Sequence, residues 1–247
     1  MKATCFLAGL CLLLTAQLSS SVAAETPPSV DAIIEKYISA IGGKAAVEKI
    51  KTRVMKMSFE GGGSTGDYTE YGKALRKRAW TLVADWGEIS EVVDGEKAWT
   101  KNPDGSVREK TGDDLARALR EADLHWDINL KSLYPNLTYK KLAKHENSDA
   151  HVLESKTTAT SVERLYFDVK SGLIVRQEGE FIGSEGSRIK IEMNYSDYKA
   201  TDGVKFPHTL WMKFGPEGED GFTFTLKAKE LKNNVEVDEA KFKKPTE

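Results

Sequence analysis

The second half of the chain alternates between apolar and polar residues, and this two-residue period limits the possible folds more than any other feature. Side chains of a β-strand point alternately to opposite faces, so each alternating stretch has one apolar and one polar face. Four stretches keep this pattern: Leu165 to Val169, Ile189 to Tyr195, Leu210 to Phe214, and Phe222 to Leu226. Strands of this kind are typical of antiparallel sheets that are covered on one side only.

The first half of the chain shows the same period, interrupted by turn signals. Two expected strands keep their apolar residues on one face: Met55, Met57 and Phe59 in one, Trp80 and Leu82 in the other. Asp94-Gly95 and the segment 102–105 (Asn-Pro-Asp-Gly) are typical of tight hairpin turns. We expect about ten or eleven strands, which hairpins would join into one curved or barrel-like antiparallel sheet.

Helical spacing replaces the two-residue period in two regions. The first runs from Val30 to Ile41, begins after a capping Ser29 and ends at Gly42-Gly43, with a shorter helical piece over 44–50. The second is an amphipathic helix over 113–126, with an expected capping pair of Thr111 and Asp114. Its apolar side includes Leu115 and Leu119.

These helices are the main apolar segments available to cover the sheet. The chain is therefore predicted to be α+β, with the N-terminal helix and the inserted helix packed on the concave face of a curved antiparallel sheet. So few helices can hardly fill so wide a sheet, and the space between helix and sheet is a candidate ligand cavity. The alternative is a tightly filled core.

The N-terminus has the pattern of a secretory signal peptide. Lys2 precedes an apolar run from Phe6 to Ala16, and Val22-Ala23-Ala24 is a small-residue cleavage signal. We expect residues 1–24 to be removed and residues 25–247 to form a single exported domain, soluble after cleavage. Both cysteines, Cys5 and Cys11, lie in the removed segment, so the mature chain would contain neither a disulfide nor a thiolate ligand.

Signals for catalysis, metal binding and nucleic-acid binding are weak. The chain has 36 Lys and Arg residues against 38 Asp and Glu, without the basic patch that nucleic acid requires. None of its four histidines has metal-ligand spacing, and we expect no metal and no cofactor. Segment 62–66 (Gly-Gly-Ser-Thr-Gly) matches the nucleophile elbow of hydrolases formally, but the residues after it look extended. A hydrolase that uses Ser64 is therefore the least favoured reading, and we expect a protein without catalytic residues.

Several short motifs occur in a recognisable order. A hairpin reads Asp94-Gly95-x-x-x-Trp99-x-x-Asn102-Pro103, and a later turn reads Asp168-x-x-x-Gly172-Leu173-Ile174. Further on come Tyr195-x-Asp197-Tyr198, a Gly-Val-Lys-Phe-Pro segment at 203–207, and Val237-Asp238 followed by Phe242 and Pro245. Over most of the mature chain, this order resembles the periplasmic lipoprotein carriers LolA and LolB and their superfamily, in particular its lipoprotein-sorting branch.

The resemblance implies a half-open β-barrel with a helical lid and an apolar interior that takes acyl chains. It also implies a periplasmic location, with lipid or lipoprotein acyl chains, and an envelope membrane protein, as partners. The carriers have an arginine at the end of an early strand that ties down the lid. Arg78 is the matching candidate here, and Arg76, which has the same parity, is the other; exposed basic residues on a sheet edge are the alternative.

The sequence therefore predicts a binding or carrier protein for a hydrophobic ligand, which it would hold without covalent chemistry. Ten residues are expected to line the cavity: Met55, Met57, Phe59, Trp80, Leu82, Leu115, Leu119, Ile191, Met193 and Phe224. The alternative is a non-catalytic structural or protein-interaction module of the cell envelope, with the same sheet around a filled core.

Overall fold

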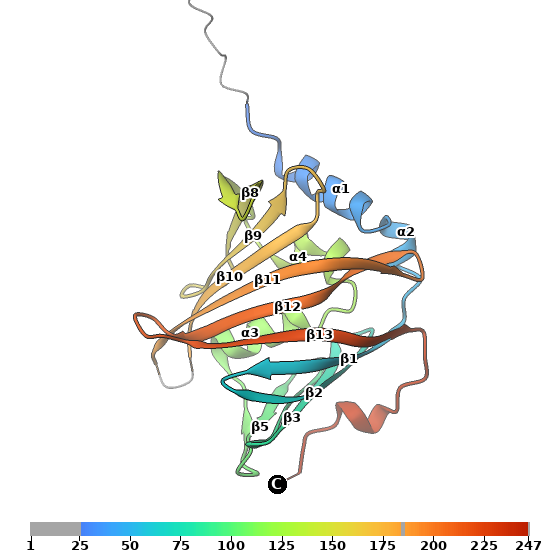
Figure 1. The fold of residues 1–247 in the computed structure, drawn as a ribbon, viewed down its shortest axis with the longest axis vertical. Coiled ribbons are helices and arrows are strands. Elements are labelled where there is room, and N and C mark those ends of the chain that lie inside the picture. Colours follow the sequence, from blue (N-terminus) through green and yellow to red (C-terminus); the bar gives the residue numbers. More distant parts are fainter. Residues whose placement is uncertain (1–25, 184–185, 247) are drawn as a thin grey trace, which may run out of the picture.

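Thirteen antiparallel strands form one sheet in the computed structural model, which describes residues 26–183 and 186–246 (Figure 1). The predicted signal peptide lies outside these residues. The strands lie in the order β6-β5-β4-β3-β2-β1-β13-β12-β11-β10-β9-β8-β7, so β6 and β7 are its edges and the sheet is not closed. Their bounds are β1 Thr52–Gly61, β2 Ser64–Lys73, β3 Lys77–Ala84, β4 Gly87–Asp94, β5 Ala98–Lys101, β6 Val107–Glu109, β7 Thr138–His145, β8 Ser148–Lys156, β9 Val162–Asp168, β10 Ile174–Ile182, β11 Arg188–Thr201, β12 Val204–Pro216 and β13 Phe222–Asn233.

The structure confirms the predicted fold class, an α+β chain dominated by a curved antiparallel sheet. The number of strands is thirteen rather than ten or eleven. The two edge strands explain why the sequence underestimates it. β6 has only three residues, and β7 alternates weakly because both of its faces carry exposed lysines, among them Lys140 and Lys144.

The N-terminal helices form where the sequence predicts them. Helix α1 covers Val30–Ala40, and the Ser29 side chain accepts a hydrogen bond from the amide of Ala32 at 3.1 Å. Helix α2 is shorter than expected, Lys44–Val47. Between them, Gly42 has a φ of +120°, and a Cβ there would lie 2.0 Å from the carbonyl oxygen of Gly203. Only glycine therefore lets the end of α1 approach the β11–β12 turn so closely.

The inserted helix is shorter than predicted and is followed by two more turns of helix. Helix α3 covers Gly112–Glu121, then come the 3-10 helix η1 (Trp126–Ile128) and α4 (Leu130–Leu133). Helix α3 ends early because the Asp123 carboxylate accepts a hydrogen bond from the amide of His125 at 2.8 Å, and this contact forms a turn. Thr111 occupies the expected N-cap position, but its side chain makes no capping hydrogen bond. Asp114 pairs with Arg108 at 3.3 Å instead.

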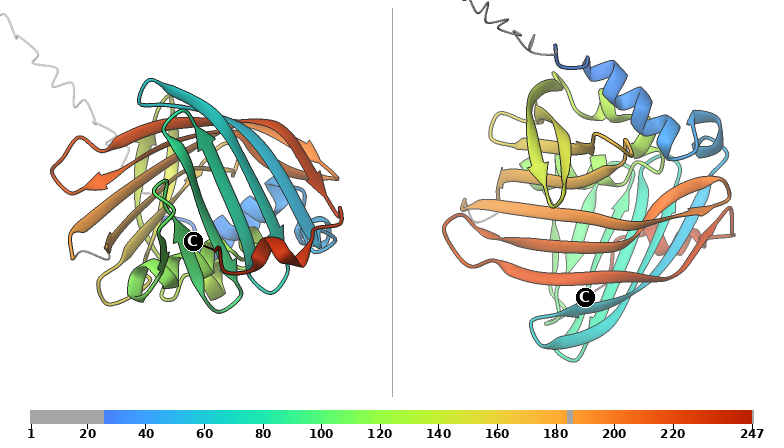
Figure 2. Two further views of the ribbon diagram at one scale, coloured as in Figure 1. Left: turned by 90° about the horizontal axis from the view of Figure 1, so that it is seen from below. Right: turned by 45° about the horizontal axis from the view of Figure 1, so that its top comes forward.

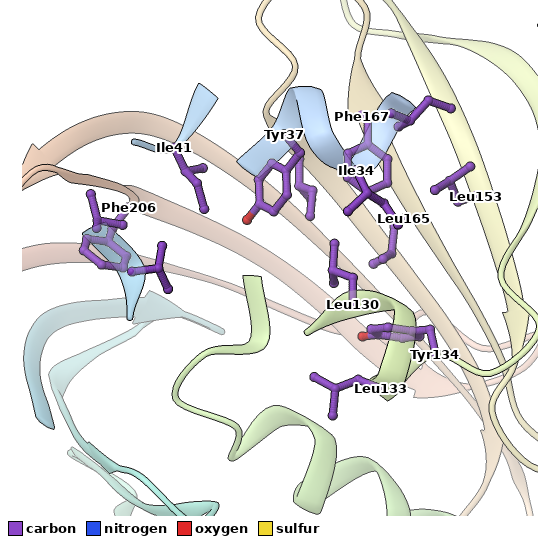
Figure 3. Packing of buried hydrophobic residues seen from close by; sticks show 14 of the residues in the cluster. Ile34, Tyr37, Ile41, Leu130, Leu133, Tyr134, Leu153, Leu165, Phe167 and Phe206 are labelled. Carbon is purple, nitrogen blue, oxygen red and sulfur yellow. The ribbon is translucent and has the colours of Figure 1, made fainter. Parts of the chain in front are cut away.

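All of these helices pack on one face of the sheet, which we call the inner face (Figure 2). Under α1 and α4, apolar side chains from the helices meet those of β8 to β10 in the largest buried cluster. Figure 3 shows Tyr37 of α1 near Phe167 of β9, with Leu130 and Tyr134 below them. The rings of Tyr37 and Phe167 are 5.6 Å apart, edge to face. This half of the inner face is therefore filled by the helices.

The C-terminal segment covers part of the opposite, outer face. Val237 and Phe242, the latter in the 3-10 helix η2 (Glu239–Phe242), pack on Ala79, Val92 and Trp99 of β3, β4 and β5. Among the described residues, no helix has the length and apolar character needed to cross a membrane.

Candidate functional site

The half of the inner face that the large cluster leaves free carries a second apolar cluster, which we call the inner patch. It consists of Met57, Phe59, Tyr68, Leu82 and Leu226, from β1, β2, β3 and β13. Strand register brings them together, because Met57 lies opposite Tyr68, Tyr68 opposite Leu82, and Phe59 opposite Leu226. Met57 and Phe59 are 0% and 1% exposed, so the centre of the patch is densely packed.

Most of the predicted cavity residues belong to this patch or border it. Met57, Phe59 and Leu82 are members, and three others pack against it while partly buried: Met55, Trp80 and Phe224. Met193 and Ile191 lie two strands from β13, where Met193 faces Met212 and Ile191 faces Phe214. Leu115 and Leu119 of α3 pack elsewhere, on Val93 and Ala98. The structure thus gathers six of the ten residues in one place and not all ten.

At one end of the inner patch, aromatic side chains become exposed to solvent. We call Trp86, Phe214 and Phe222 the aromatic rim; they are 42%, 40% and 40% exposed. The rim continues directly into the patch, since the ring centroid of Phe59 lies 6.3 Å from Trp86, 6.5 Å from Phe222 and 5.4 Å from Phe224. Edge-to-face and offset ring pairs at such distances are favourable. An apolar path therefore leads from solvent to buried Phe59.

Sequence reasoning left the aromatic rim out of the site. Phe214 and Phe222 have the parity of the apolar face, and this signal could have placed them there. Trp86 lies in the turn between β3 and β4, where residue parity predicts no direction.

Glycines let the β1–β2 hairpin pack against the rim. A Cβ on Gly61 would lie 2.4 Å from the Cβ of Phe224, and one on Gly62 would lie 2.8 Å from the ring of Phe222. Gly62 and Gly63 form the turn with positive φ, and Ser64 begins β2. A nucleophile elbow joins a strand to a helix, whereas Ser64 joins two antiparallel strands. The hydrolase reading of this motif has no structural support.

A group of charged side chains lies on the inner face beside the patch and beneath α3. Arg78 of β3 contacts Glu70 of β2 at 2.7 Å, Glu121 of α3 at 3.4 Å and Glu91 of β4 at 3.8 Å. It also donates to the hydroxyl of Tyr68, a member of the inner patch, at 3.4 Å. Arg78 therefore points inward and links α3 to the sheet, whereas Arg76 is exposed in the β2–β3 turn, with a φ of +58°.

These contacts shift the acid–base behaviour of the group. Burial by itself would raise the pKa of Glu70, but the charge of Arg78 and hydrogen bonds from Arg78 and Tyr68 outweigh burial and lower it. The pKa of Glu121 is lowered in the same way, against burial, by Arg117 and Arg78. Both carboxylates therefore stay ionised at neutral pH, and α3 is held by charge.

A second ion pair ties α3 to a distant strand on the same inner face of the sheet. Arg120 of α3 and Glu163 of β9 are 8% and 3% exposed and form a buried salt bridge. Gln177 of β10 donates to Glu163 and to the Tyr134 hydroxyl, at 3.2 Å each, and accepts from Tyr195 at 3.0 Å. Helix α3 therefore bridges β3 and β9, which lie far apart in the sheet order.

Two clefts lie along the outer face of the sheet, and outward side chains rather than the predicted cavity residues make up most of their linings. One of about 450 Å³ is formed by the β1–β2 hairpin and β13, and includes Phe224 among polar neighbours. The other, of about 330 Å³, lies over β10 to β12 and includes Ile191 among charged neighbours. Each contains one of the ten predicted cavity residues. Over the described ranges, no group of three or more His, Cys, Asp or Glu side chains could hold a metal ion.

Comparisons with known proteins find the likeness in structure and not in sequence. No protein-family model matches the chain, and no curated protein matches it. A LolA superfamily protein from Nitrosomonas europaea superposes with a TM-score of 0.53 at 13% identity, over 88% of this chain and 99% of that one. A proposed outer-membrane lipoprotein-sorting protein domain from Vibrio parahaemolyticus gives 0.51 at 13% identity, over 78% and 89%. The resemblance seen in the motifs is thereby confirmed at the level of the fold: the chain has a LolA-like fold.

Proposed function

We propose that the chain is a periplasmic binding or carrier protein that holds an acyl chain of a lipid or lipoprotein on its inner face without covalent chemistry. The aromatic rim carries this proposal. It places three partly exposed rings, Trp86, Phe214 and Phe222, where the inner patch meets solvent. Exposed apolar groups that lead into a buried apolar cluster are typical of sites for hydrophobic ligands.

The packing of the inner patch sets a condition on this function. Because Met57 and Phe59 are fully buried, an acyl chain must part these side chains as it enters. Methionine suits this task, since its flexible thioether adapts to irregular partners. Two methionines of β11 and β12, Met193 and Met212, lie beside Phe224 in register and extend the adaptable surface. Each methylene that leaves water contributes about 0.8 kcal/mol, so apolar area alone can hold a chain.

The same dense packing favours a second candidate function, a structural or protein-interaction module with a filled core. Lipid extraction from natively purified protein, followed by mass spectrometry, and titration with a fluorescent fatty acid distinguish the two. The carrier binds the probe saturably and releases it to unlabelled fatty acid. A module with a filled core binds none.

The variant Phe222→Ser tests the role of the rim. A phenylalanine buries about 200 Å² when fully covered. Phe222 is 40% exposed, so a ligand could cover about 80 Å² more of it, worth about 2 kcal/mol or a roughly 30-fold loss of affinity on removal. The matched control is Thr223→Ser, on the other face of the same strand, which should bind as the unmodified chain does. Equal binding by both variants would remove the rim from the site.

A further inference from the structure

Inward side chains of β1 and β13 continue from the aromatic rim to the opposite end of the inner face. We call them the apolar stripe: Phe59, Met57 and Met55 of β1 with Leu226, Ala228 and Leu231 of β13. The next inward residue of β1 after Met55 is Arg53, which lies opposite Asn233. The six residue steps of β1 between Phe59 and Arg53 span roughly 20 Å. The apolar stripe therefore ends at a guanidinium group.

Two neighbours orient the guanidinium of Arg53. It lies 4.0 Å from the ring centroid of Phe206, and its Nε donates to the Asn233 side-chain oxygen at 3.3 Å. The Asn233 amide nitrogen donates to Asp202 at 3.1 Å, which turns the amide oxygen toward Arg53. The Nη2 atom of Arg53 is also buried, yet it has no hydrogen-bond partner among the described residues. Such a donor is exceptional, because a buried polar group without a partner destabilises the fold.

The two carboxylates that act on Arg53 through their charge have other partners. Asp127 accepts a hydrogen bond from the Tyr37 hydroxyl, and Glu70 accepts one from Arg78 at 2.7 Å. Neither carboxylate forms an ion pair with Arg53 within the part of the chain that the structure describes. Burial lowers the pKa of Arg53 from its ordinary value, although the charges of Asp127 and Glu70 act to raise it. The two carboxylates therefore compensate the buried guanidinium only in part.

The Arg53 end of the apolar stripe lies close to the protein surface. Arg53 is the second residue of β1 and is only partly buried, and the preceding Lys51 is exposed. A polar group at Arg53 can therefore stay near water while an attached apolar chain lies along the stripe. Arginine suits an oxyanion in this place, since its planar fork of N–H groups matches the oxygens of a carboxylate or a phosphate.

We propose that Arg53 binds the oxyanion head group of an anionic amphiphile, a carboxylate or a phosphate monoester, whose apolar chain lies along the apolar stripe. This inference rests on the proposed function and adds the class and the orientation of the ligand. The Nη2 atom donates a hydrogen bond to an oxygen of the head group, which brings a negative charge to the guanidinium. The chain of the ligand runs from Arg53 toward the aromatic rim.

Displacement of the uncharged fluorescent probe N-phenyl-1-naphthylamine at pH 8 tests the proposal on the unmodified chain. The competitors are dodecanoate, dodecyl phosphate, dodecanol and inorganic phosphate. At least one of the two twelve-carbon anions should bind about ten- to a hundredfold more tightly than dodecanol, because hydrogen bonds to charged groups are strong. The tighter of the two identifies the head group. Inorganic phosphate, which has no apolar chain, should not displace the probe.

The same series separates the failure of this inference from the failure of the proposed function. Equal affinities for the three twelve-carbon compounds overturn the head-group site and leave the proposed function in place. Inorganic phosphate that competes as strongly as dodecyl phosphate overturns the assignment of an amphiphile. Absence of displacement by every competitor overturns the proposed function and the head-group site together.

A matched pair of variants on β1 assigns the preference to Arg53. Arg53→Gln removes the charge and should bring both anions to within about twofold of dodecanol, with the affinity for dodecanol unchanged. Lys56→Gln removes a positive charge from the outer face of the same strand and should keep the preference. A preference that survives in Arg53→Gln, or that both variants lose, contradicts the assignment. If Arg53→Gln does not fold, Arg53→Lys decides: it retains the charge without the planar fork and should weaken the preference. An unchanged preference in Arg53→Lys contradicts the assignment.

Discussion

The buried pair of Arg120 and Glu163 gives the sharpest test of how α3 is held. Arg120 is 8% exposed. In the variant Glu163→Ala its guanidinium stays buried but no longer has the carboxylate of Glu163 as its partner. Leaving one partner of a buried pair without the other costs about 3–5 kcal/mol. For a chain of this size 1 kcal/mol corresponds to about 2–4 °C in Tm, so the expected fall is roughly 6–20 °C.

The assay is thermal unfolding at pH 7 by calorimetry or circular dichroism, combined with hydrogen exchange of the α3 amides. The matched control is Glu154→Ala on β8, whose ion pairs with Lys140 and Arg164 lie nearer the surface and should cost about 1 kcal/mol or less. The double variant Arg120→Met/Glu163→Leu removes both charges and should recover most of the stability.

Two results would refute this reasoning. A loss below about 1 kcal/mol for Glu163→Ala means that the pair does not hold α3. Additive effects of the Arg120 and Glu163 substitutions mean that the two side chains do not interact.

The expected result in Glu163→Ala is faster hydrogen exchange of the α3 amides, while the exchange of the β11 amides stays unchanged.

Three further predictions concern pH, backbone strain and the C-terminal segment. The pKa of Glu70 and of Glu121 is lowered from the ordinary 4.5, so the pairing of these carboxylates stabilises the fold fully above about pH 4.5. This stabilisation is lost as the pH falls through the lowered pKa values. Arg78→Met should therefore reduce the dependence of the free energy of unfolding on acid pH. In a denaturant titration, Gly42→Ala should lower the free energy of unfolding by more than about 1 kcal/mol, because the new Cβ would lie 2.0 Å from the carbonyl oxygen of Gly203. Gly43→Ala should lower it less, because a Cβ at that position would have no neighbouring atom within 4 Å. Phe242→Ala should cost about 3 kcal/mol because the ring is 3% exposed, whereas Lys243→Ala on the surface should be nearly neutral; equal losses would contradict the packing of the C-terminal segment.

The two-residue period predicted the inner face well because it reports burial directly. Met57, Phe59 and Leu226 have the parity that the sequence assigns to the covered face, and strand register brings them into contact. The same period failed at β7, an edge strand whose alternation is weak. The pattern therefore identified the strands that bury one whole face, and it gave little signal at an edge strand that is only partly buried.

The ion pair of Arg120 and Glu163 could not be predicted from the pattern, for a different reason. Arg120 on an amphipathic helix reads as a solvent-facing residue, and its partner Glu163 is 43 positions away. One signal was present, since Glu163 shares its parity with Leu165 and Phe167 and is thus a charge on an apolar face. Only the tertiary pairing explains that exception, because a buried carboxylate needs a partner that sequence spacing cannot supply.

Methionine methyl groups offer the most direct test of ligand binding on the inner face. Four of the five methionines, Met55, Met57, Met193 and Met212, lie on this face. NMR of ¹³C-methyl-labelled protein, titrated with a fourteen-carbon fatty acid, should shift the Met57 and Met212 signals along one saturable curve. Saturable binding by calorimetry while all four methyl signals stay in place would show that the ligand binds elsewhere, and would contradict the account.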